Sequence, residues 1–251
     1  MIELKSPREI ELMREAGRIV AAVLRELASA LRPGITTADL DRLAERLIRE
    51  AGAEPAFKGY QGFPASICTS INDEVVHGIP SPRRVIREGD VVSIDVGARY
   101  HGYHGDSAAT FAVGAVSAEA RRLLEVTRRS LEAGIAAARP GHRVGDVGHA
   151  VQQVVEAAGF SVVRDYAGHG IGRAMHEDPQ VPNYGQPGTG LRLRPGLVLA
   201  IEPMVNAGGP AVRTDPDGWT VRTVDGSLSA HFEHTVLITE GEPEVLTAGA
   251  F

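Results

Sequence analysis

"LRPGITTADLDRLAERLIREAGA", residues 31–53, has a counterpart 107 residues further along the chain, "ARPGHRVGDVGHAVQQVVEAAGF", residues 138–160. Identical residues keep this offset, among them Pro33 with Pro140, Gly34 with Gly141, Asp39 with Asp146 and Gly52 with Gly159. Self-similarity at a fixed offset is typical of a duplicated structural unit. We therefore predict two related halves, about 1–125 and 126–251, within a single domain spanning 1–251.

Each of the two segments has the pattern of an amphipathic helix. Apolar side chains follow a Pro-Gly turn at helical spacing, as Leu40, Leu43 and Leu47 in the first segment and as Val147, Val151 and Val154 in the second. Both segments end at a glycine suited to a helix C-cap. The pattern predicts one such helix in each half.

The same repeat places acids at equivalent points of both halves. The offset of 107 puts "GDVVSID", 89–95, on "GLVLAIE", 196–202, so that Asp95 corresponds to Glu202. Asp106 and Glu233 each precede an apolar strand with a glycine eight residues on. Because duplicated α/β units pack about a pseudo-twofold axis, equivalent strands should meet at the centre. We expect the four carboxylates to converge on one cleft.

The second half carries 20 extra residues, because Glu233 follows Asp106 by 127 positions instead of 107. The excess lies in "NAGGPAVRTDPDGWTVRTVDGS", 206–227. Its Asp217-Gly218 and Asp225-Gly226 pairs are typical of hairpin turns. We predict an inserted hairpin at each of them.

Four converging carboxylates would be costly without cations. A single acid at the end of a strand more often solvates a turn, but four ionised acids within a few ångströms repel one another strongly. One divalent ion would leave a charge of about −2, whereas two would balance the set, as in two-metal hydrolytic sites. The charge argument predicts a dinuclear metal centre.

A histidine ligand is expected in "YAGHGIGRAMHEDP", 166–179. Glycines flank His169 and leave room for its ring beside an ion, and an imidazole shifts the preference of an acidic site toward Mn, Fe, Co or Zn. The alternatives are a glycine-rich turn with solvated histidines or a phosphate loop. The stretch lacks the strand-turn-helix context that a nucleotide loop needs.

The remaining histidines divide by their surroundings. His231 shares a strand face with Glu233 by two-residue periodicity, so it should point toward the metals or their immediate neighbours. A lone histidine such as His77, before a Gly-Ile-Pro turn, is more often structural. Four others are expected in turns or near an exposed helix: His101, His104, His142 and His149.

Composition excludes several classes of protein. The chain has 251 residues, of which 43% are hydrophobic and 23% charged, as in an ordinary globular protein with a large core. A net charge of −6 without a basic run gives no footprint for nucleic acid. No stretch approaches the roughly 18 apolar residues of a membrane span, and the N-terminus is charged, so a cytoplasmic protein is expected. The single cysteine, Cys68, excludes an internal disulfide and is expected to be a small buried hydrophobe.

Six motifs in order, "SINDEVVHGIP", "SIDVG", "YHGD", "GHGIGRAMHEDPQVPNYG", "AIEPMVNAG" and "HFEHTVLIT", together resemble the type I methionine aminopeptidases. The resemblance covers nearly the whole chain. It implies the pita-bread fold of that family, an α/β (α+β) architecture in which two pseudo-twofold-related halves share a central curved antiparallel sheet covered by helices.

The resemblance also implies the site residues. The family's metal ligands match Asp95, Asp106, His169, Glu202 and Glu233, which would hold two divalent ions (Co, Mn, Fe, Zn or Ni). Glu202 would be the proton shuttle, His176 would hydrogen-bond the scissile carbonyl, and His77 would steady the peptide or the departing nitrogen. The methionine pocket would fall on Phe57, Tyr60, Phe63, Cys68, Met175 and Trp219.

The implied activity is removal of the N-terminal methionine from nascent polypeptides whose second residue is small. The implied state is a monomer that acts on nascent N-termini, with docking on the ribosome left open. One alternative is a proline-specific peptidase of the same fold, which usually adds a large N-terminal domain; Pro33 already lies in the first repeat. The other is an inactive binding module, against which the intact ligand set argues.

Overall fold

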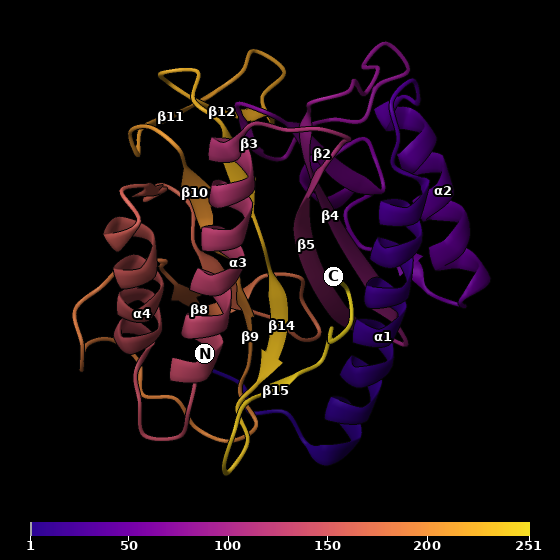
Figure 1. Cartoon of the computed structure of the whole chain (residues 1–251). Coiled ribbons are helices and arrows are strands. Elements are labelled where there is room, and N and C mark those ends of the chain that lie inside the picture. The colour runs from indigo at the N-terminus through magenta and orange to yellow at the C-terminus, as the bar shows by residue number, and fades with distance from the viewer. Residues whose placement is uncertain (1) are drawn as a thin grey trace.

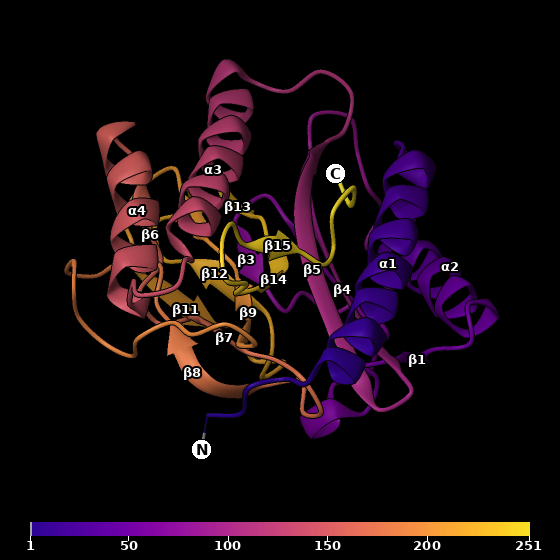
Figure 2. The same ribbon diagram turned by 90° about the horizontal axis from the view of Figure 1, so that it is seen from below.

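The computed structural model describes residues 2–251, which form four long helices and a set of antiparallel sheets (Figure 1). The helices are α1 (Pro7–Ala30), α2 (Thr37–Glu50), α3 (Ala118–Ala137) and α4 (Val144–Ala157). In Figures 1 and 2, α1 and α2 lie on one side of the molecule, α3 and α4 lie on the other, and the central strands run between them.

Every strand pairing in the four sheets is antiparallel. In the first sheet β4 (Val91–Tyr100) pairs with β1 (Glu54–Pro55), β2 (Ile67–Ile71) and β5 (Tyr103–Ala112). The largest sheet has the order β15 (Glu244–Val245), β14 (His234–Leu237), β9 (Val198–Ile201), β7 (Gly168–Gly170) and β8 (Glu177–Val181). Two smaller sheets join β13 (Ser229–His231), β10 (Met204–Asn206) and β6 (Ser161–Val162), and β11 (Val212–Thr214), β12 (Val221–Thr223) and β3 (Glu74–Val76). A 3-10 turn spans Tyr60–Gly62.

The two predicted helices are confirmed as α2 and α4, which have 14 residues each and start 107 residues apart. Their N-termini are built alike, since Asp39 accepts a hydrogen bond from the backbone N–H of Thr36 (2.8 Å) and Asp146 accepts one from that of Arg143 (2.7 Å). Such a hydrogen bond from the N-cap residue to the acid three positions on fixes the backbone where each helix begins. The two segments that lie 107 residues apart in the sequence therefore have the same local structure.

The halves meet along β5 and the start of β14. The backbone N–H of Glu233 donates to the carbonyl of Ala108 (2.8 Å), and the hydroxyl of Thr235 donates to the carbonyl of Asp106 (2.8 Å). Ser107 adds a hydrogen bond from its hydroxyl to the carbonyl of Glu233 (2.6 Å). The two equivalent acids of the repeat, Asp106 and Glu233, are thus brought side by side at the centre.

One core underlies both halves. Its largest cluster draws on all four helices and on both large sheets, including Leu24, Leu40, Ile94, Leu131, Val147, Leu199 and Val236. Burying each such side chain contributes about 1.5–3 kcal/mol. Within residues 2–251, none of the helices is both long enough and apolar enough to span a membrane.

The inserted segment forms one of the two predicted hairpins. Around Gly218, β11 and β12 pair antiparallel, and the N–H of Asp215 donates to the carbonyl of Thr220 (2.8 Å). Gly218 has φ +80°, a conformation that glycine adopts without strain. The second prediction is wrong, because the turn at Gly226 leads from β12 to β13, which belong to different sheets.

Candidate metal centre and substrate pocket

Four carboxylates and one imidazole meet between the two large sheets. Asp95 lies on β4 and Asp106 on β5, Glu202 directly follows β9, and Glu233 directly precedes β14. His169, on β7, places its Nε2 3.5 Å from Glu202 Oε1 and 3.8 Å from Asp106 Oδ2. The structure therefore brings together all five residues that the sequence predicts as metal ligands.

This cluster fits metal ions. Asp106, His169 and Glu233 each offer a ligand atom, and these atoms all lie within 4.8 Å of one another. In the described part of the chain, the buried oxygens Asp95 Oδ1, Asp106 Oδ1 and Glu233 Oε1 have no hydrogen-bond partner. Buried polar atoms are almost always paired. Bound cations would satisfy these oxygens.

Burial and mutual repulsion perturb the acids. Burial raises the pKa of Asp95 to about 7. Burial, and next the neighbouring carboxylates, raise the pKa of Asp106, Glu202 and Glu233 well above the ordinary range. A cation at the centre would reverse this by favouring the ionised form. Ionising all four acids is therefore electrostatically unfavourable unless a cation is bound among them.

The ring of His169 has the protonation state and the orientation that a metal ligand needs. Burial lowers the pKa of His169 to about 3, so its ring is neutral, as a metal ligand must be. His169 Nδ1 lies 2.8 Å from the carbonyl of Gly170 and donates to it. That hydrogen bond leaves the lone pair of Nε2 facing the carboxylates.

The glycines around His169 serve close packing. A Cβ on Gly168 would lie 2.3 Å from the carbonyl oxygen of Ala200, and one on Gly170 would lie 2.2 Å from that of Asp178. Any side chain there would collide with backbone. These glycines therefore let β7 fit between β8 and β9, which sets the position of His169 in the sheet.

Two further histidines, His77 and His176, face the metal centre. Both line one cavity with the five predicted ligands. His77 has φ +60°, an uncommon conformation for a residue with a side chain and one often found at functional sites. His176 stacks on Tyr60, whose hydroxyl lies 2.9 Å from its Nδ1. Burial lowers the pKa of His77 to about 4 and also lowers that of His176, so both rings are neutral at pH 7.

The six residues predicted to form the methionine pocket gather in one hydrophobic cluster: Phe57, Tyr60, Phe63, Cys68, Met175 and Trp219. Phe57, Phe63, Cys68 and Trp219 also line the cavity directly. Cys68 lies opposite Asp95 on the β2–β4 ladder, so the apolar wall adjoins the acids. Burial, and then the nearby carboxylates, raise the pKa of this thiol well above its ordinary value.

Two of the histidines outside the predicted site bear on the earlier expectations most directly. His231 is buried, with Nε2 3.7 Å from Glu202 Oε2, so its predicted position beside the ligands is confirmed. The prediction that His104 lies in an open turn is wrong. It is buried in β5 with Nδ1 3.0 Å from the carbonyl of Gly172. The sequence did contain a signal for this burial, because His104 lies two residues before Asp106 and so shares its face of the strand.

Comparison with known proteins agrees with this geometry. The model of metallopeptidase family M24 matches residues 11–240. The methionine aminopeptidase of Clostridium acetobutylicum is 57% identical over 247 residues, covering 98% of this chain and 99% of that protein. Methionine aminopeptidase 1 of Bacillus subtilis gives the same identity and coverage.

Solved structures agree as well. The methionine aminopeptidase of Thermotoga maritima superimposes with a TM-score of 0.97 at 52% identity, covering 98% of this chain and 99% of that one. A prolidase from Pyrococcus furiosus superimposes with a TM-score of 0.77 at 26% identity, covering 97% of this chain and 65% of that one. The predicted pita-bread fold is confirmed by these neighbours. The chain therefore belongs to metallopeptidase family M24 and, within it, to the type I methionine aminopeptidases, which are metal-dependent hydrolases of peptide bonds.

Proposed function

We propose that this enzyme removes the N-terminal methionine from nascent polypeptides when the second residue is small, with 1–251 acting as one catalytic unit. The observation that carries the proposal is the cavity in which five ligand-type side chains adjoin an apolar and aromatic wall. Unbranched, polarisable methionine packs well against aromatic and sulfur-bearing surfaces. The chemistry and the specificity would then occupy neighbouring walls of one cavity.

Two divalent ions, drawn from Co, Mn, Fe, Zn or Ni, would be held by Asp95, Asp106, His169, Glu202 and Glu233. Two ions balance the four carboxylates, which matches the unpaired buried oxygens. When bound, such ions polarise the scissile carbonyl and lower the pKa of water so that it can attack at neutral pH.

Glu202 is placed to move protons. One of its oxygens lies 3.5 Å from His169 Nε2 and the other lies 3.7 Å from His231 Nε2, so the carboxylate is flanked by two imidazole rings. Burial raises its pKa, which strengthens it as a base. It would accept the proton of the attacking water and deliver it to the departing nitrogen.

His176 would stabilise the developing oxyanion. With the Tyr60 hydroxyl, 2.9 Å from Nδ1, donating to that atom, the neutral ring would carry its proton on Nε2. That N–H can donate to the carbonyl oxygen, where a hydrogen bond strengthens as charge develops. His77, on the same cavity wall, would contact the peptide beyond the scissile bond and confine the second residue.

A peptide assay on the metal-free protein tests the proposal. Met-Ala, Met-Leu and Xaa-Pro peptides would each be incubated with added Co, Mn, Fe, Zn or Ni, with metal content determined in parallel. We expect two bound ions per chain, rapid cleavage of Met-Ala peptides and slow cleavage of Met-Leu peptides. Cleavage of Xaa-Pro peptides without need for methionine would instead indicate prolidase-type specificity. Absence of bound metal and of cleavage would indicate a binding module.

Action on nascent chains also implies where the enzyme works. We propose that it meets its substrates in the cytoplasm as a monomer, and docking on the ribosome stays a prediction. Sedimentation of the purified protein and its co-sedimentation with ribosomes test these two points separately.

A further inference from the structure

The inserted hairpin of the second half reaches across to the first half. Its strand β12 pairs with β3, with Val221 opposite Val76 and Arg222 opposite Glu74. His77 directly follows Val76, and the Trp219 position lies two residues before Val221. Because the strands are antiparallel, both pocket residues leave this ladder at the same end. The position of the hairpin on β3 therefore sets how Trp219 and His77 face each other.

The backbone ladder alone holds this hairpin weakly. Only two residue pairs are in register, and the register shifts between Val221 and Arg222. Short two-stranded pairing is marginally stable by itself. One further backbone hydrogen bond joins the N–H of Thr223 to the carbonyl of Asp73 (2.9 Å), and side chains add to this constraint.

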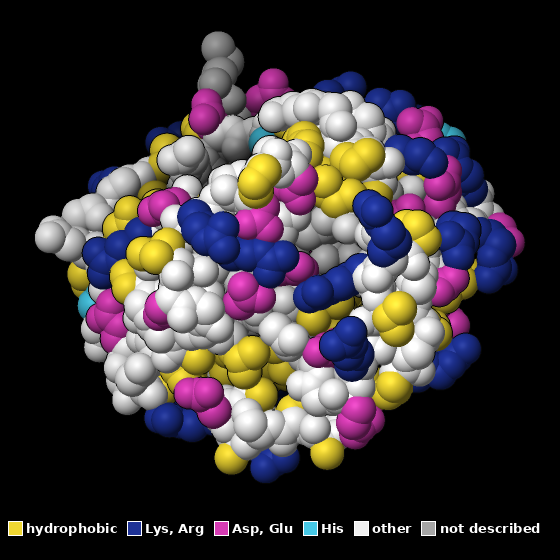
Figure 3. Space-filling model, turned by 90° about the horizontal axis from the view of Figure 1, so that it is seen from above, with side chains coloured by type: hydrophobic (Ala, Val, Ile, Leu, Met, Phe, Trp, Pro, Cys, Tyr) yellow, Lys and Arg dark blue, Asp and Glu magenta, His cyan; other side chains and the backbone are white. Residues whose placement is uncertain are grey.

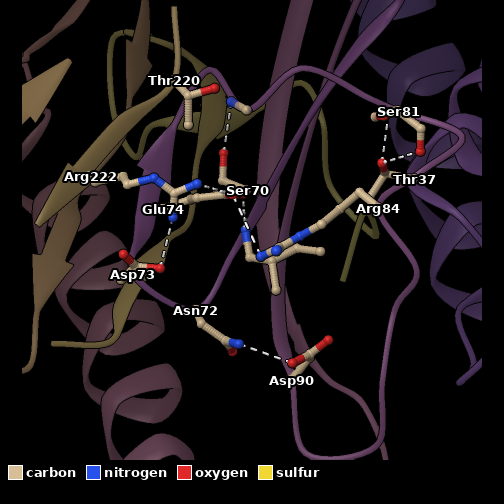
Figure 4. Close-up of polar contacts among 12 residues, drawn as sticks. Thr37, Ser70, Asn72, Asp73, Glu74, Ser81, Arg84, Asp90, Thr220 and Arg222 are labelled. Carbon is tan, nitrogen blue, oxygen red and sulfur yellow. Dashed lines mark hydrogen bonds and ion pairs between the residues drawn. The ribbon is translucent and has the colours of Figure 1, made fainter. Parts of the chain in front are cut away.

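Arg222 adds such a constraint by contacting three carboxylates, two of which, Asp73 and Glu74, are labelled beside it in Figure 4. Its guanidinium donates from Nε to Asp215 Oδ2 (2.5 Å), from Nη1 to Asp73 Oδ1 (3.0 Å) and from Nη2 to Glu74 Oε1 (2.8 Å). Asp215 follows β11, Asp73 precedes β3, and Glu74 lies on β3. One planar side chain thus ties the hairpin to the turn and the strand that lead to His77.

Two other arginines lie beside this network of acids, but neither of them contacts all three carboxylates. Arg84 approaches Glu74 at 3.6 Å, and Arg213 contacts Asp215 at 3.0 Å, but each has one partner in the network. Glu74 also accepts from the backbone N–H of Ile71 (2.6 Å). Figure 3, which looks onto the end of the molecule where Figure 1 places this hairpin, shows basic and acidic side chains interleaved. In the described chain, Arg222 is the side chain that joins all three acids.

We propose that Arg222 is a positioning residue for the methionine pocket: it fixes the inserted hairpin on β3 and thereby holds Trp219 at a set position opposite His77. Trp219 meets Phe63 edge-on with ring centroids 5.1 Å apart and faces His77 at 6.3 Å. Arg222 itself does not line the cavity formed by the described residues, so it acts through these rings. The inference rests on the proposed function, since it assigns the pocket to methionine.

The test uses Trp219 as an internal probe, because it is the chain's only tryptophan. Arg222→Met keeps the length of the side chain but removes its charge and donors, and Arg222→Lys keeps the charge but not the planar fork. Arg14→Met is the matched control, because Arg14 makes two hydrogen bonds of 2.7 Å to Glu244 without contacting the hairpin. We expect red-shifted Trp219 emission and greater quenching by acrylamide for Arg222→Met, a smaller change for Arg222→Lys and no change for the control.

Kinetics on a Met-Ala peptide give the second readout, at a temperature where thermal unfolding shows each variant folded. Arg222→Met should raise KM about tenfold with kcat changed less than about twofold, as expected when ground-state binding is lost. In a Trp219→Ala background the same substitution should have little further effect.

Unchanged Trp219 fluorescence in Arg222→Met, or effects of Arg222→Met and Trp219→Ala that multiply independently, would overturn the inference. If Arg222→Met does not fold, fluorescence and kinetics are measured on Arg222→Lys and Asp215→Asn instead. Unchanged Trp219 fluorescence in these variants, or effects that multiply independently with Trp219→Ala, would then overturn the inference. Failure of the wild-type enzyme on every methionine peptide would instead refute the proposed function, while the fluorescence result would still decide the position of the hairpin.

Discussion

The proposed metal centre and the proposed methionine pocket share one cavity but arise differently from the chain. Four of the five centre residues form equivalent pairs in the repeat, Asp95 with Glu202 and Asp106 with Glu233. The pocket has no such symmetry, since the first half supplies most of its aromatic wall and the inserted hairpin supplies Trp219. The duplication thus explains a centre of paired charges, whereas the differences between the halves account for the pocket.

The strongest test of this contrast removes one member of a ligand pair. Asp106→Asn or Glu233→Gln should reduce turnover by about a thousandfold or more with the fold retained, because each removes a charge that two cations balance. Circular dichroism, metal analysis and peptide cleavage would be measured together. A folded variant that loses a metal ion yet keeps more than a few per cent of wild-type turnover would contradict the dinuclear assignment.

A second test separates chemistry from binding within the cavity. His176→Ala should lower kcat about a hundredfold and change KM much less, because its hydrogen bond strengthens as the oxyanion forms. Steady-state kinetics on a Met-Ala peptide would measure both constants. A raised KM with unchanged kcat would make His176 an ordinary binding residue.

A third test concerns the part of the cavity that lacks the symmetry of the repeat. It varies the second residue of the substrate. A confined site should disfavour bulky residues by about 1–3 kcal/mol, or roughly ten- to a hundredfold in rate, so Met-Ile peptides should be cut more slowly than Met-Ala peptides. Equal rates would refute the confined site.

A chain expressed from Met1 offers a parallel readout. Ile2 is bulky and β-branched, so the chain should keep Met1, whereas an Ile2→Ala variant should lose it in a host whose enzymes share the rule. Met1 lies outside the described residues. Intact-mass measurement of both proteins would check this expectation.

The smallest effect concerns the stability of the metal-free protein. The pKa of Asp95 is raised from 3.8 to about 7 in the folded state, so this carboxyl stabilises the fold below about pH 4 and that contribution is lost as the pH rises to about 7. Metal-free Asp95→Asn lacks this loss and should gain stability relative to the wild type across the same window. Urea unfolding of both proteins at pH 4.5 and pH 7.5 measures the difference, and the parallel His contributions cancel in it. A difference independent of pH would contradict the raised pKa of Asp95.

The sequence by itself determined the repeated helices, the four acids at equivalent points of the repeat, and His169 in its glycine-rich stretch. These are local signals, since periodicity, turn chemistry and residue type can be read within a few residues. The fixed offset then related the halves without any knowledge of their contacts. For this reason the candidate metal ligands are predictable from the sequence alone.

Only the tertiary structure decided the burial of His104, the course of the second predicted turn and the network of Arg222. Arg222 and Glu74 are 148 positions apart, and Lys5, buried against Glu177 at 2.6 Å, is 172 positions from its partner. Such pairings depend on which strands and loops pack together, and that is settled by burial of the whole core. No pattern within either short segment specifies its distant partner, so these contacts follow from the fold alone.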